Sequence, residues 1–435
     1  MTTTQGPARA PWFDLARHNV RWALPASLQA IMQNGLLDRT FQDSLVPQFL
    51  YAATATAEAW AGGLGDTKTF TRTGLMAPVP TAITGNDAST GTYGVEQWSV
   101  SMDQYGNAID TNMLTSSMSL ASKWLQDAKT LGVNAGQSIN QLVRGRLYTA
   151  YAGGRTWATV SSSSSTSLTV QNAAGFGTVL SNGVQIPVSG ATPLSITIAG
   201  VANTVTGVNT TTNVLTLGTA ATVAVGAAVI ASTAPVSVRA TGANTAYDLT
   251  SSNTATFAMF RSAVARLRSM NVPTEGGYYV AHVDATTEAQ LFSDADFKQA
   301  LQGRVDSPIY RDLSIGRFGG IDWVRNMESP TVLGGSAGAL TVHRPIVMGA
   351  DCLVAAPFEG TASLLAGTGV EDVPLIEMID VAPAVQVARI VRPPQDRLQQ
   401  VLSTAWSYVG DFGVPSDALS GDNAVFKRAV VLEHA

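Results

Sequence analysis

The segment Gly334 to Gly338 (GGSAG) has the most specific chemical pattern in the sequence. It matches the Gly-x-Ser-x-Gly nucleophile elbow of serine hydrolases, in which Ser336 would lie on a sharp turn between a strand and a helix. Here the residues from Ala339 to Pro345 predict a strand and a turn, not a helix. A triad would also need a histidine. His343 has no acid between it and the serine, and His434 is the other candidate. We therefore interpret the segment as a glycine-rich surface loop, with a serine hydrolase as a rival reading.

Two other segments resemble phosphate-binding sites. The run Gly62 to Thr69 looks like a phosphate loop, but that motif needs glycine directly before its lysine, and a threonine stands before Lys68. Arg261, Arg266 and Arg268 fall on one predicted helix and could meet phosphate. Apolar residues fill the opposite face of this helix, so an ordinary amphipathic helix, or one that pairs with acidic neighbours, explains the arginines equally well.

The remaining candidates predict no metal or cofactor site. Asp294 and Asp296 could touch a cation, but no further carboxylate or calcium-loop glycine accompanies them, so we interpret them as a solvated helix face. His282 lies within a strand-like run and is interpreted as a strand histidine, not a general base. One cysteine, Cys352, and four histidines supply neither an intrachain disulfide nor zinc-ligand spacing. We predict no catalytic, cofactor-binding or metal-binding residues and no enzymatic activity.

The charge composition limits the possible partners. With 26 Lys and Arg against 31 Asp and Glu, the 435-residue chain has a formal net charge of −5 and no basic run, so a polyanion-binding surface is not the default expectation. Charged residues make up only 13%, so the surface must be largely uncharged and polar or hidden in contacts with other subunits. No segment resembles a secretory signal or a membrane span, and we expect a soluble protein made in a cytoplasm.

A separate all-β module is predicted between Thr156 and Val238. These 83 residues contain no Asp, Glu, Lys or Arg, and 27 of them are Ser or Thr. Apolar residues alternate with polar ones in pairs, which is typical of half-buried strands and disfavours the alternative of a disordered segment. The pairs are Leu168 with Val170, Ile196 with Ile198, Leu215 with Leu217, and Val223 with Val225. We predict a small barrel or sandwich, entered through a flexible serine run, Ser161 to Ser165.

The sequence on either side of this module is mixed. Apolar residues recur every three or four positions from Leu114 to Tyr151, which predicts one long amphipathic helix, or two helices with a break near Gly132. Another helix is predicted from Asn253 to Met270, followed by a strand and a helix capped by Asp284. The predicted strands are Gly277 to Val283, Ile321 to Arg325, Val385 to Val391 and Ala429 to Leu432.

An extended arm precedes the long helix. Residues Asp66 to Gln104 are polar and rich in glycine and proline, with strand-like ends at Thr67 to Thr73 and Val95 to Val100. This pattern predicts a two-stranded hairpin with a loose tip. An isolated hairpin buries too little surface to be stable, so we expect the arm to need a neighbouring subunit.

Several of these segments resemble the major capsid protein of tailed bacteriophages, which has the Hong Kong 97-type or Johnson fold. Residues Phe41 to Phe49 and Ala57 to Trp60, leading into Gly65 to Arg72, are similar to its N-arm and extended E-loop. The stripe from Leu114 to Tyr151 resembles its spine helix. The segments that resemble its closing axial and peripheral parts are His343 to Gly349, Arg392 to Gln400, Trp406 and Gly410.

The resemblance implies an α+β fold with an N-arm, E-loop, spine helix, and peripheral and axial domains, into which an all-β barrel or sandwich is inserted. The implied domains are 1–65 (N-terminal arm), 66–105 (E-loop), 106–155 (spine helix region), 156–240 (inserted all-β domain), 241–384 (axial domain) and 385–435 (return strands). No long charged helical segment precedes the arm, so we expect no protease-removed delta region. Covalent cross-linking through Lys68 is left open.

The function that the resemblance implies is structural. Copies would self-assemble as pentamers and hexamers into an icosahedral shell around double-stranded DNA, without sequence-specific DNA binding, a cofactor or a membrane. The shell would form in the host bacterial cytoplasm and become the virion capsid. Portal, scaffold and decoration proteins are candidates for further partners. The alternatives are an encapsulin-like shell that encloses enzymes, and a tail or adhesin protein that uses the β module for binding.

Five residues are predicted to make contacts between subunits. Arg72, Trp98 and Asp103 lie in the arm, and Arg304 and Arg311 lie in the central domain. These polar or aromatic residues fall in segments with little apolar core of their own. The β module is expected on the outer surface of the shell.

Overall fold

The computed structural model describes residues 41, 43–44, 50–58, 60, 65–73, 76, 90–118, 123–181, 184–240, 242–302, 316–336, 338–358, 375–382, 385–392, 394, 396–398, 400–415 and 428–435. The chain divides into two compact units. The first comprises residues 1–49, 104–139 and 360–409, and the second comprises 50–103, 140–359 and 410–435. No helix in the described residues is both long and apolar enough to cross a membrane.

A long helix and an antiparallel sheet form the first unit. Its elements are β4 (Asp103–Asn112), α4 (Met113–Met118), the beginning of α5 (Lys123–Tyr151), β21 (Leu375–Ala382), β22 (Val385–Arg392) and most of β23 (Val401–Gly413). β22 pairs antiparallel with β21 and β23. Trp124 and Ala128 of α5 are buried with Val391 and Leu402 of the sheet, so the apolar stripe of the helix faces a core, as its spacing predicts.

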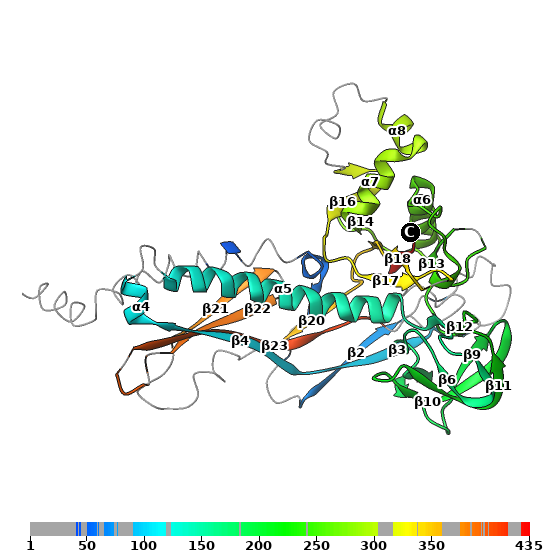
Figure 1. Cartoon of the computed structure of the whole chain (residues 1–435), viewed down its shortest axis with the longest axis horizontal. Coiled ribbons are helices and arrows are strands. Elements are labelled where there is room, and N and C mark those ends of the chain that lie inside the picture. The colour runs from blue at the N-terminus through cyan, green and yellow to red at the C-terminus, as the bar shows by residue number, and fades with distance from the viewer. Residues whose placement is uncertain are drawn as a thin grey trace, which may run out of the picture. The chain divides into compact units, whose positions relative to one another are not determined.

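The long helix does not break at Gly132. Helix α5 has 29 residues, and Figure 1 shows it as uninterrupted. Of the two alternatives that the sequence left open at Gly132, the unbroken helix is confirmed. A Cβ atom at Gly132 would lie 2.1 Å from Ser44 Oγ and 2.8 Å from the Phe41 carbonyl oxygen. The glycine therefore permits another segment to approach the helix closely, and burial of the apolar stripe offsets its helix penalty of about 1 kcal/mol.

A six-stranded sheet in the second unit, here called the mixed sheet, has the order β13-β24-β19-β14-β16-β15. Its strands are β13 (Ser237–Val238), β14 (Tyr279–Val283), β15 (Arg317–Phe318), β16 (Ile321–Arg325), β19 (Ile346–Met348) and β24 (Ala429–Leu432). The helices of this region are η3 (Ala246–Asp248), α6 (Phe257–Ser269), α7 (Ala285–Ser293) and α8 (Ala295–Gln302). α6 and α8 bury Phe260 and Phe297 in one core with Tyr279, Trp323 and Val347.

Local signals predicted this region well. α6 ends where the helix stop is predicted, although it begins at Phe257 instead of Asn253. Asp284 caps α7 by accepting a hydrogen bond from Thr287 N, which confirms the predicted cap. The predicted strands over residues 277–283, 321–325 and 429–432 are confirmed as β14, β16 and β24.

The inserted module is a small closed barrel. Its strands are β5 (Arg155–Trp157), β6 (Ser162–Thr169), β9 (Leu194–Ile198), β10 (Val201–Asn209), β11 (Val214–Val223) and β12 (Ala228–Ala231). They pair in the order β5-β12-β9-β10-β11-β6, and a bridge between Ala158 and Val170 joins the last strand back to the first. Seven of the eight residues in the predicted alternating pairs are buried in its core.

Two details of the barrel differ from prediction. Ser161 to Ser165 is not a flexible entry, because β6 begins at Ser162 and pairs with β11, where Ser162 Oγ donates a hydrogen bond to Ala221 O. Val225 is 51% exposed because β11 ends at Val223 and the chain turns at Gly226. β13 lies in the mixed sheet, so the observed barrel strands run from Arg155 to Ala231, and the module boundaries 156–240 stay a prediction.

The predicted arm forms a hairpin within a four-stranded sheet. Strands β2 (Thr67–Thr73) and β3 (Val95–Ser101) pair antiparallel, with Phe70 opposite Trp98. β3 also pairs in parallel with β8 (Val184–Pro187), which pairs with β7 (Thr178–Ser181) from the inserted segment. The hairpin is therefore supported by its own chain, and the expectation that it needs a neighbouring subunit for support is wrong.

Candidate functional site

The Gly-x-Ser-x-Gly segment lies in a β-hairpin. Strand β17 (Thr331–Gly334) pairs antiparallel with β18 (Leu340–His343), so no helix follows Ser336. Gly335 and Gly338 have φ values of +73° and +64°, which permit the turn that exposes the serine. A nucleophile elbow needs a strand-to-helix turn. The predicted surface loop is confirmed, and this geometry is wrong for a serine hydrolase.

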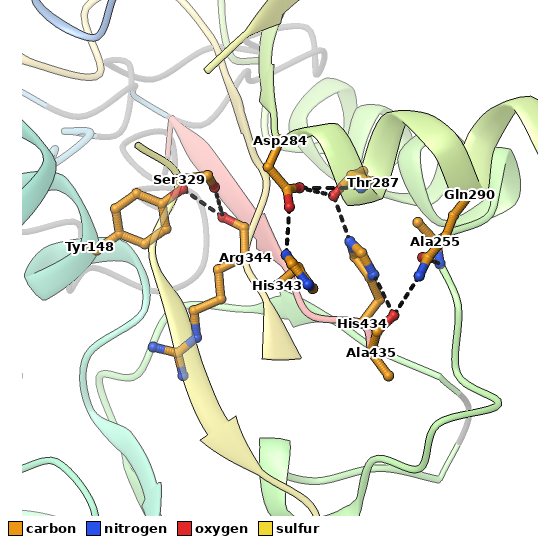
Figure 2. A network of polar contacts seen from close by, with 10 residues as sticks. All are labelled: Tyr148, Ala255, Asp284, Thr287, Gln290, Ser329, His343, Arg344, His434 and Ala435. Atoms are coloured by element: carbon orange, nitrogen blue, oxygen red, sulfur yellow. Dashed lines mark hydrogen bonds and ion pairs between the residues drawn. The ribbon is translucent and has the colours of Figure 1, made fainter. Parts of the chain in front are cut away.

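The two histidines considered for a triad bind other partners. His343 Nδ1 lies 2.5 Å from Asp284 Oδ2, and His434 Nε2 lies 2.7 Å from the Thr287 hydroxyl, which in turn donates to Asp284. Figure 2 shows both rings directed at the beginning of α7. The two rings stack, with their centroids 5.5 Å apart. Thr287 and His434 are fully buried, so these two members of the network are not accessible to a substrate.

This network fastens the segment that follows β24. His343 and His434 exchange two main-chain hydrogen bonds, of 2.8 and 3.2 Å. Gln290 Nε2 donates to Ala435 O at 2.7 Å, and Gln290 Oε1 accepts from Ala255 N at 2.6 Å (Figure 2). One side chain of α7 therefore joins the beginning of α6 to the segment after β24. The arrangement is a structural clamp.

A buried carboxylate lies next to the clamp. Glu433 is only 2% exposed and lies between Arg344, at 2.9 Å, and the Arg239 guanidinium. Burial alone would raise the pKa of Glu433, but the charges and hydrogen bonds of Arg344 and Arg239 hold it below its usual value. The carboxylate therefore stays charged, and the two arginines depend on it for compensation.

His282 occupies the strand position that the sequence predicts. It lies in β14, is 1% exposed, and packs its ring 4.6 Å from the ring of Tyr51. Its Nδ1 atom lies 3.4 Å from Asn326 Nδ2. Burial lowers the pKa of His282 to about 3, so the ring is neutral at physiological pH. A general base must reach its substrate, and this fully buried ring does not.

The predicted solvated face at Asp294 and Asp296 is wrong for the first of them. Asp294 lies between α7 and α8, where Oδ2 accepts from Phe257 N at 2.7 Å and Oδ1 accepts from Asp296 N at 3.2 Å. It satisfies main-chain donors at the beginnings of two helices, whereas Asp296 is exposed. The described residues contain no cluster of three metal-ligating side chains. The glycine-rich run at 62–64 lies outside the described residues.

Trp98 does not lie at a free surface. It is 4% exposed, stacks on Phe70 with centroids 5.6 Å apart, and shares a core with Trp60, Val100 and Val354. A Cβ atom at Gly413 would lie 3.0 Å from Trp98 Nε1, which shows how closely β23 covers the indole. We therefore correct the prediction of a subunit contact at Trp98, because its surface is already used within its own chain.

The other predicted contact residues remain untested. Arg72 lies on β2 opposite Glu96, and Asp103 is exposed at the beginning of β4. Arg304 and Arg311 lie outside the described residues. Lys68 Nζ lies 3.4 Å from Glu58 Oε1 and 5.0 Å from the centre of the Phe70 ring, so it has partners within its own chain.

The parallel pairing of β3 with β8 is the main feature that sequence reasoning missed. Asn182-Gly183 is a strong hairpin signal between the strand-like segments 178–181 and 184–187. It could have predicted β7 and β8. It could not have predicted that their partner is the distant arm, because pairing between residues 97 and 184 leaves no local signal.

Solved structures similar to this chain are capsids. Neither a protein-family model nor a curated protein matches the sequence. The capsid of Ralstonia phage GP4 matches 87% of this chain and 86% of its own, with 12% identity and a TM-score of 0.50. The capsids of cyanophages P-SCSP1u and Pam1 match 89% and 90% of this chain, and 88% and 92% of their own, with 11% and 12% identity and TM-scores of 0.48 and 0.47.

The Ralstonia phage GP4 match spans most of both chains, and at 12% identity it establishes the fold. The elements agree with the predicted α+β class: an arm hairpin, a long helix, a mixed sheet with helices and an extra all-β barrel. The chain therefore has the Hong Kong 97-type fold of tailed-phage capsid proteins, with an inserted β module.

Proposed function

We propose that this chain is the major capsid protein of a tailed bacteriophage. Its copies assemble as pentamers and hexamers into an icosahedral shell that encloses double-stranded DNA. The likeness to the capsid of Ralstonia phage GP4, over 87% of the chain, is the observation that carries this proposal. The absence of a histidine facing Ser336 within the described residues agrees with a structural role.

The physical basis of the assembly is repetition. A closed shell repeats every subunit contact many times, so each contact can be weak while the whole is stable. The low content of charged residues, 13%, agrees with extensive burial between copies. Arg72 and Asp103 in the arm, with Arg304 and Arg311, are the proposed contact residues. The barrel is proposed to lie on the outer surface.

The proposal extends to location and partners. The shell forms in the cytoplasm of the bacterial host and is part of the virion. Portal, scaffold or decoration proteins join it, and the DNA is held without sequence preference. The low charge of the chain suits such a container, because a dense basic surface would hinder DNA entry and exit.

Negative-stain electron microscopy of the purified, concentrated protein tests this proposal. We expect closed shells or rings of five and six subunits. A protein that stays monomeric with its natural partners supplied would overturn the proposal. Shells purified from the host that contain protein cargo and no nucleic acid would point instead to an encapsulin-like compartment, and trimers or fibres to a tail protein.

The contact residues are tested with a double variant, Arg72→Ala with Asp103→Ala. We expect folded capsomers that fail to close into shells. The matched control is Lys298→Ala, which removes an exposed charge from α8 and should leave shells intact. Normal shells from the double variant would remove the arm residues from the proposed contacts without affecting the proposed function.

A further inference from the structure

Helix α6 presents a face of one charge sign. Its buried side, which includes Phe260, Val264 and Leu267, faces the core of the mixed sheet. Its exposed side bears Arg261, Arg266 and Arg268, and the helix contains no Asp or Glu. We call these three side chains the α6 arginine face. Arg266 and Arg268 lie in the last turn, where basic residues complement the helix dipole, but Arg261 does not, and no acid in the helix balances the three charges.

The spacing of these arginines suits an extended anion. Arg261 and Arg268 are seven residues apart, so their Cα atoms lie on nearly the same side of the helix, about 10.5 Å apart along its axis. The Arg268 guanidinium reaches toward Gly320, where a Cβ atom would lie 3.0 Å from it. Arg266 lies on the other flank of the exposed arc. The exposed residues between them are small, among them Ser262 and Ala265. A chain of anionic groups can therefore approach the helix backbone between two basic flanks.

The arginines of this face have no carboxylate partner. Among the described residues no Asp or Glu forms an ion pair with Arg261, Arg266 or Arg268. Two arginines of the mixed sheet do have carboxylate partners. Arg317 lies 3.1 Å from Asp322, and Arg325 lies 2.7 Å from Glu288. Among the described residues, the α6 arginine face is thus a cluster of three positive charges that no ion pair neutralises.

We infer that the α6 arginine face binds the phosphodiester backbone of double-stranded DNA. This inference rests on the proposed function and names the surface through which a copy touches the enclosed DNA. The 10.5 Å separation spans about three base-pair steps of a duplex, at about 3.4 Å of helix axis for each phosphate of one strand. Arginine donates paired, charge-assisted hydrogen bonds to phosphate oxygens. Phosphate contacts position DNA without reading its sequence.

The contact is weak in each copy. Three phosphate contacts give an affinity that falls as about the 2.7th power of salt concentration, which is about 40-fold between 50 and 200 mM. The net charge of −5 means that the rest of the chain adds repulsion, so the local basic face determines the orientation of binding. Many copies in a shell would sum these contacts while each stays readily reversible.

Fluorescence anisotropy with the unassembled full chain and a mixed-sequence duplex tests the inference. Binding is measured across the same range of salt for the wild type and for the triple variant R261Q/R266Q/R268Q. We expect the logarithmic salt slope to fall by about 2.7 in the variant, since each lost contact removes about 0.9. The matched control R317Q/R325Q removes two arginines that already have carboxylate partners, and its slope should stay within about 1 of the wild type.

A second variant tests whether the positive charge alone sets the salt dependence of DNA binding. R261K/R266K/R268K keeps the charge but not the planar guanidinium, so it should keep the salt slope of the wild type. A wild type that binds no duplex at 50 mM salt, or a glutamine variant with an unchanged slope, would overturn the inference. A glutamine variant that keeps its slope but fails to form shells would assign the face to a neighbouring copy. Shell formation by the wild type is scored separately, so failure of the proposed function remains distinguishable.

Discussion

The barrel and the mixed sheet are stabilised by different kinds of buried side chains. The barrel has no ionisable side chain from Thr156 to Val238, and its interior is largely apolar, with Leu215 and Phe176 fully buried. The mixed sheet also has an apolar core, but it buries His282, His434 and Glu433 beside it. One region is therefore insensitive to pH by composition, whereas the other depends on the protonation state of a few buried groups.

This difference follows from what each region must join. The barrel is a closed sheet whose strands satisfy one another, so threonine and serine complete its surface hydrogen bonds. The mixed sheet contains strands from residue 237 to residue 432. The clamp at Asp284 and the neighbouring ion pair of Glu433 hold these distant segments together. Charged pairs give such a junction geometric specificity that apolar contacts do not supply.

The largest expected effect is loss of the buried carboxylate. Glu433→Ala leaves Arg239 and Arg344 buried without compensation, so the mixed sheet should lose about 3–5 kcal/mol of unfolding free energy. Hydrogen exchange of β24 peptides measures this loss, with barrel peptides as the internal reference. Asp322→Ala, which removes an exposed partner of Arg317, should cost less than about 1 kcal/mol. Equal exchange in β24 of both variants would contradict the assigned role of Glu433.

The second prediction destabilises the barrel and uses the mixed sheet as the reference. Leu215→Ala removes a fully buried side chain and should destabilise the barrel by about 3 kcal/mol. Barrel peptides should exchange faster while β14 and β24 stay protected. The control Leu333→Ala changes a 58% exposed leucine and should leave both regions within about 0.5 kcal/mol of the wild type. Spread of the effect into the mixed sheet would show that the two regions unfold together.

Acid should separate the two regions. The folded pKa of His282, about 3, lies below the unfolded value of 6.5, so the unfolded state takes up the proton first as pH falls. The stability present above pH 6.5 is lost on acidification, by about 2 kcal/mol at pH 5. Burial also lowers the pKa of His434, so its protonation in the unfolded state further reduces the stability of the fold as pH falls.

The acid effect is measured by hydrogen exchange at pH 7 and pH 5, corrected for intrinsic rates. Peptides of β14 and β24 should lose protection relative to barrel peptides, which contain nothing that titrates in this range. The variant His282→Asn removes the group responsible and should flatten the pH dependence of β14. If β14 protection is the same at both pH values, the buried neutral His282 contributes nothing to the pH dependence of the stability of the mixed sheet.

The smallest effect concerns a helix terminus. Asp294→Ala removes the acceptor for Phe257 N and Asp296 N, and should cost about 1 kcal/mol. The neighbouring variant Asp296→Ala, on an exposed side chain, should change stability by less than about 0.5 kcal/mol. Thermal unfolding of both variants measures the difference. Identical transitions would restore the interpretation of the pair as a solvated face.

The sequence predicted what local pattern determines. The alternating pairs of the barrel, the strand ends of the arm and the cap at Asp284 all depend on neighbours within a few residues. Prediction failed where a distant segment decides the outcome. Trp98 is buried because residues 354 and 413 reach it, and the local pattern left open whether the helix continues through Gly132.

The chemical site was predicted mainly by exclusion. The turn after Ser336 and the order of the histidines already disfavoured a hydrolase, and the hairpin of β17 and β18 shows why. The clamp itself was not predicted, because its members lie at residues 284, 343 and 434 and have no common spacing. Each was visible as a residue type, but only the folded chain brings them together.

Closure of the barrel has a consequence for crowding. The bridge between Ala158 and Val170 joins the two terminal strands of the sheet, so less open edge is left to which another strand could add. A particle that displays one barrel on every copy, each with Arg155 as its only charged residue, would bring these modules to very high local concentration with little charge repulsion between them. Open edges there would seed cross-β growth from particle to particle, and joining the terminal strands reduces that template.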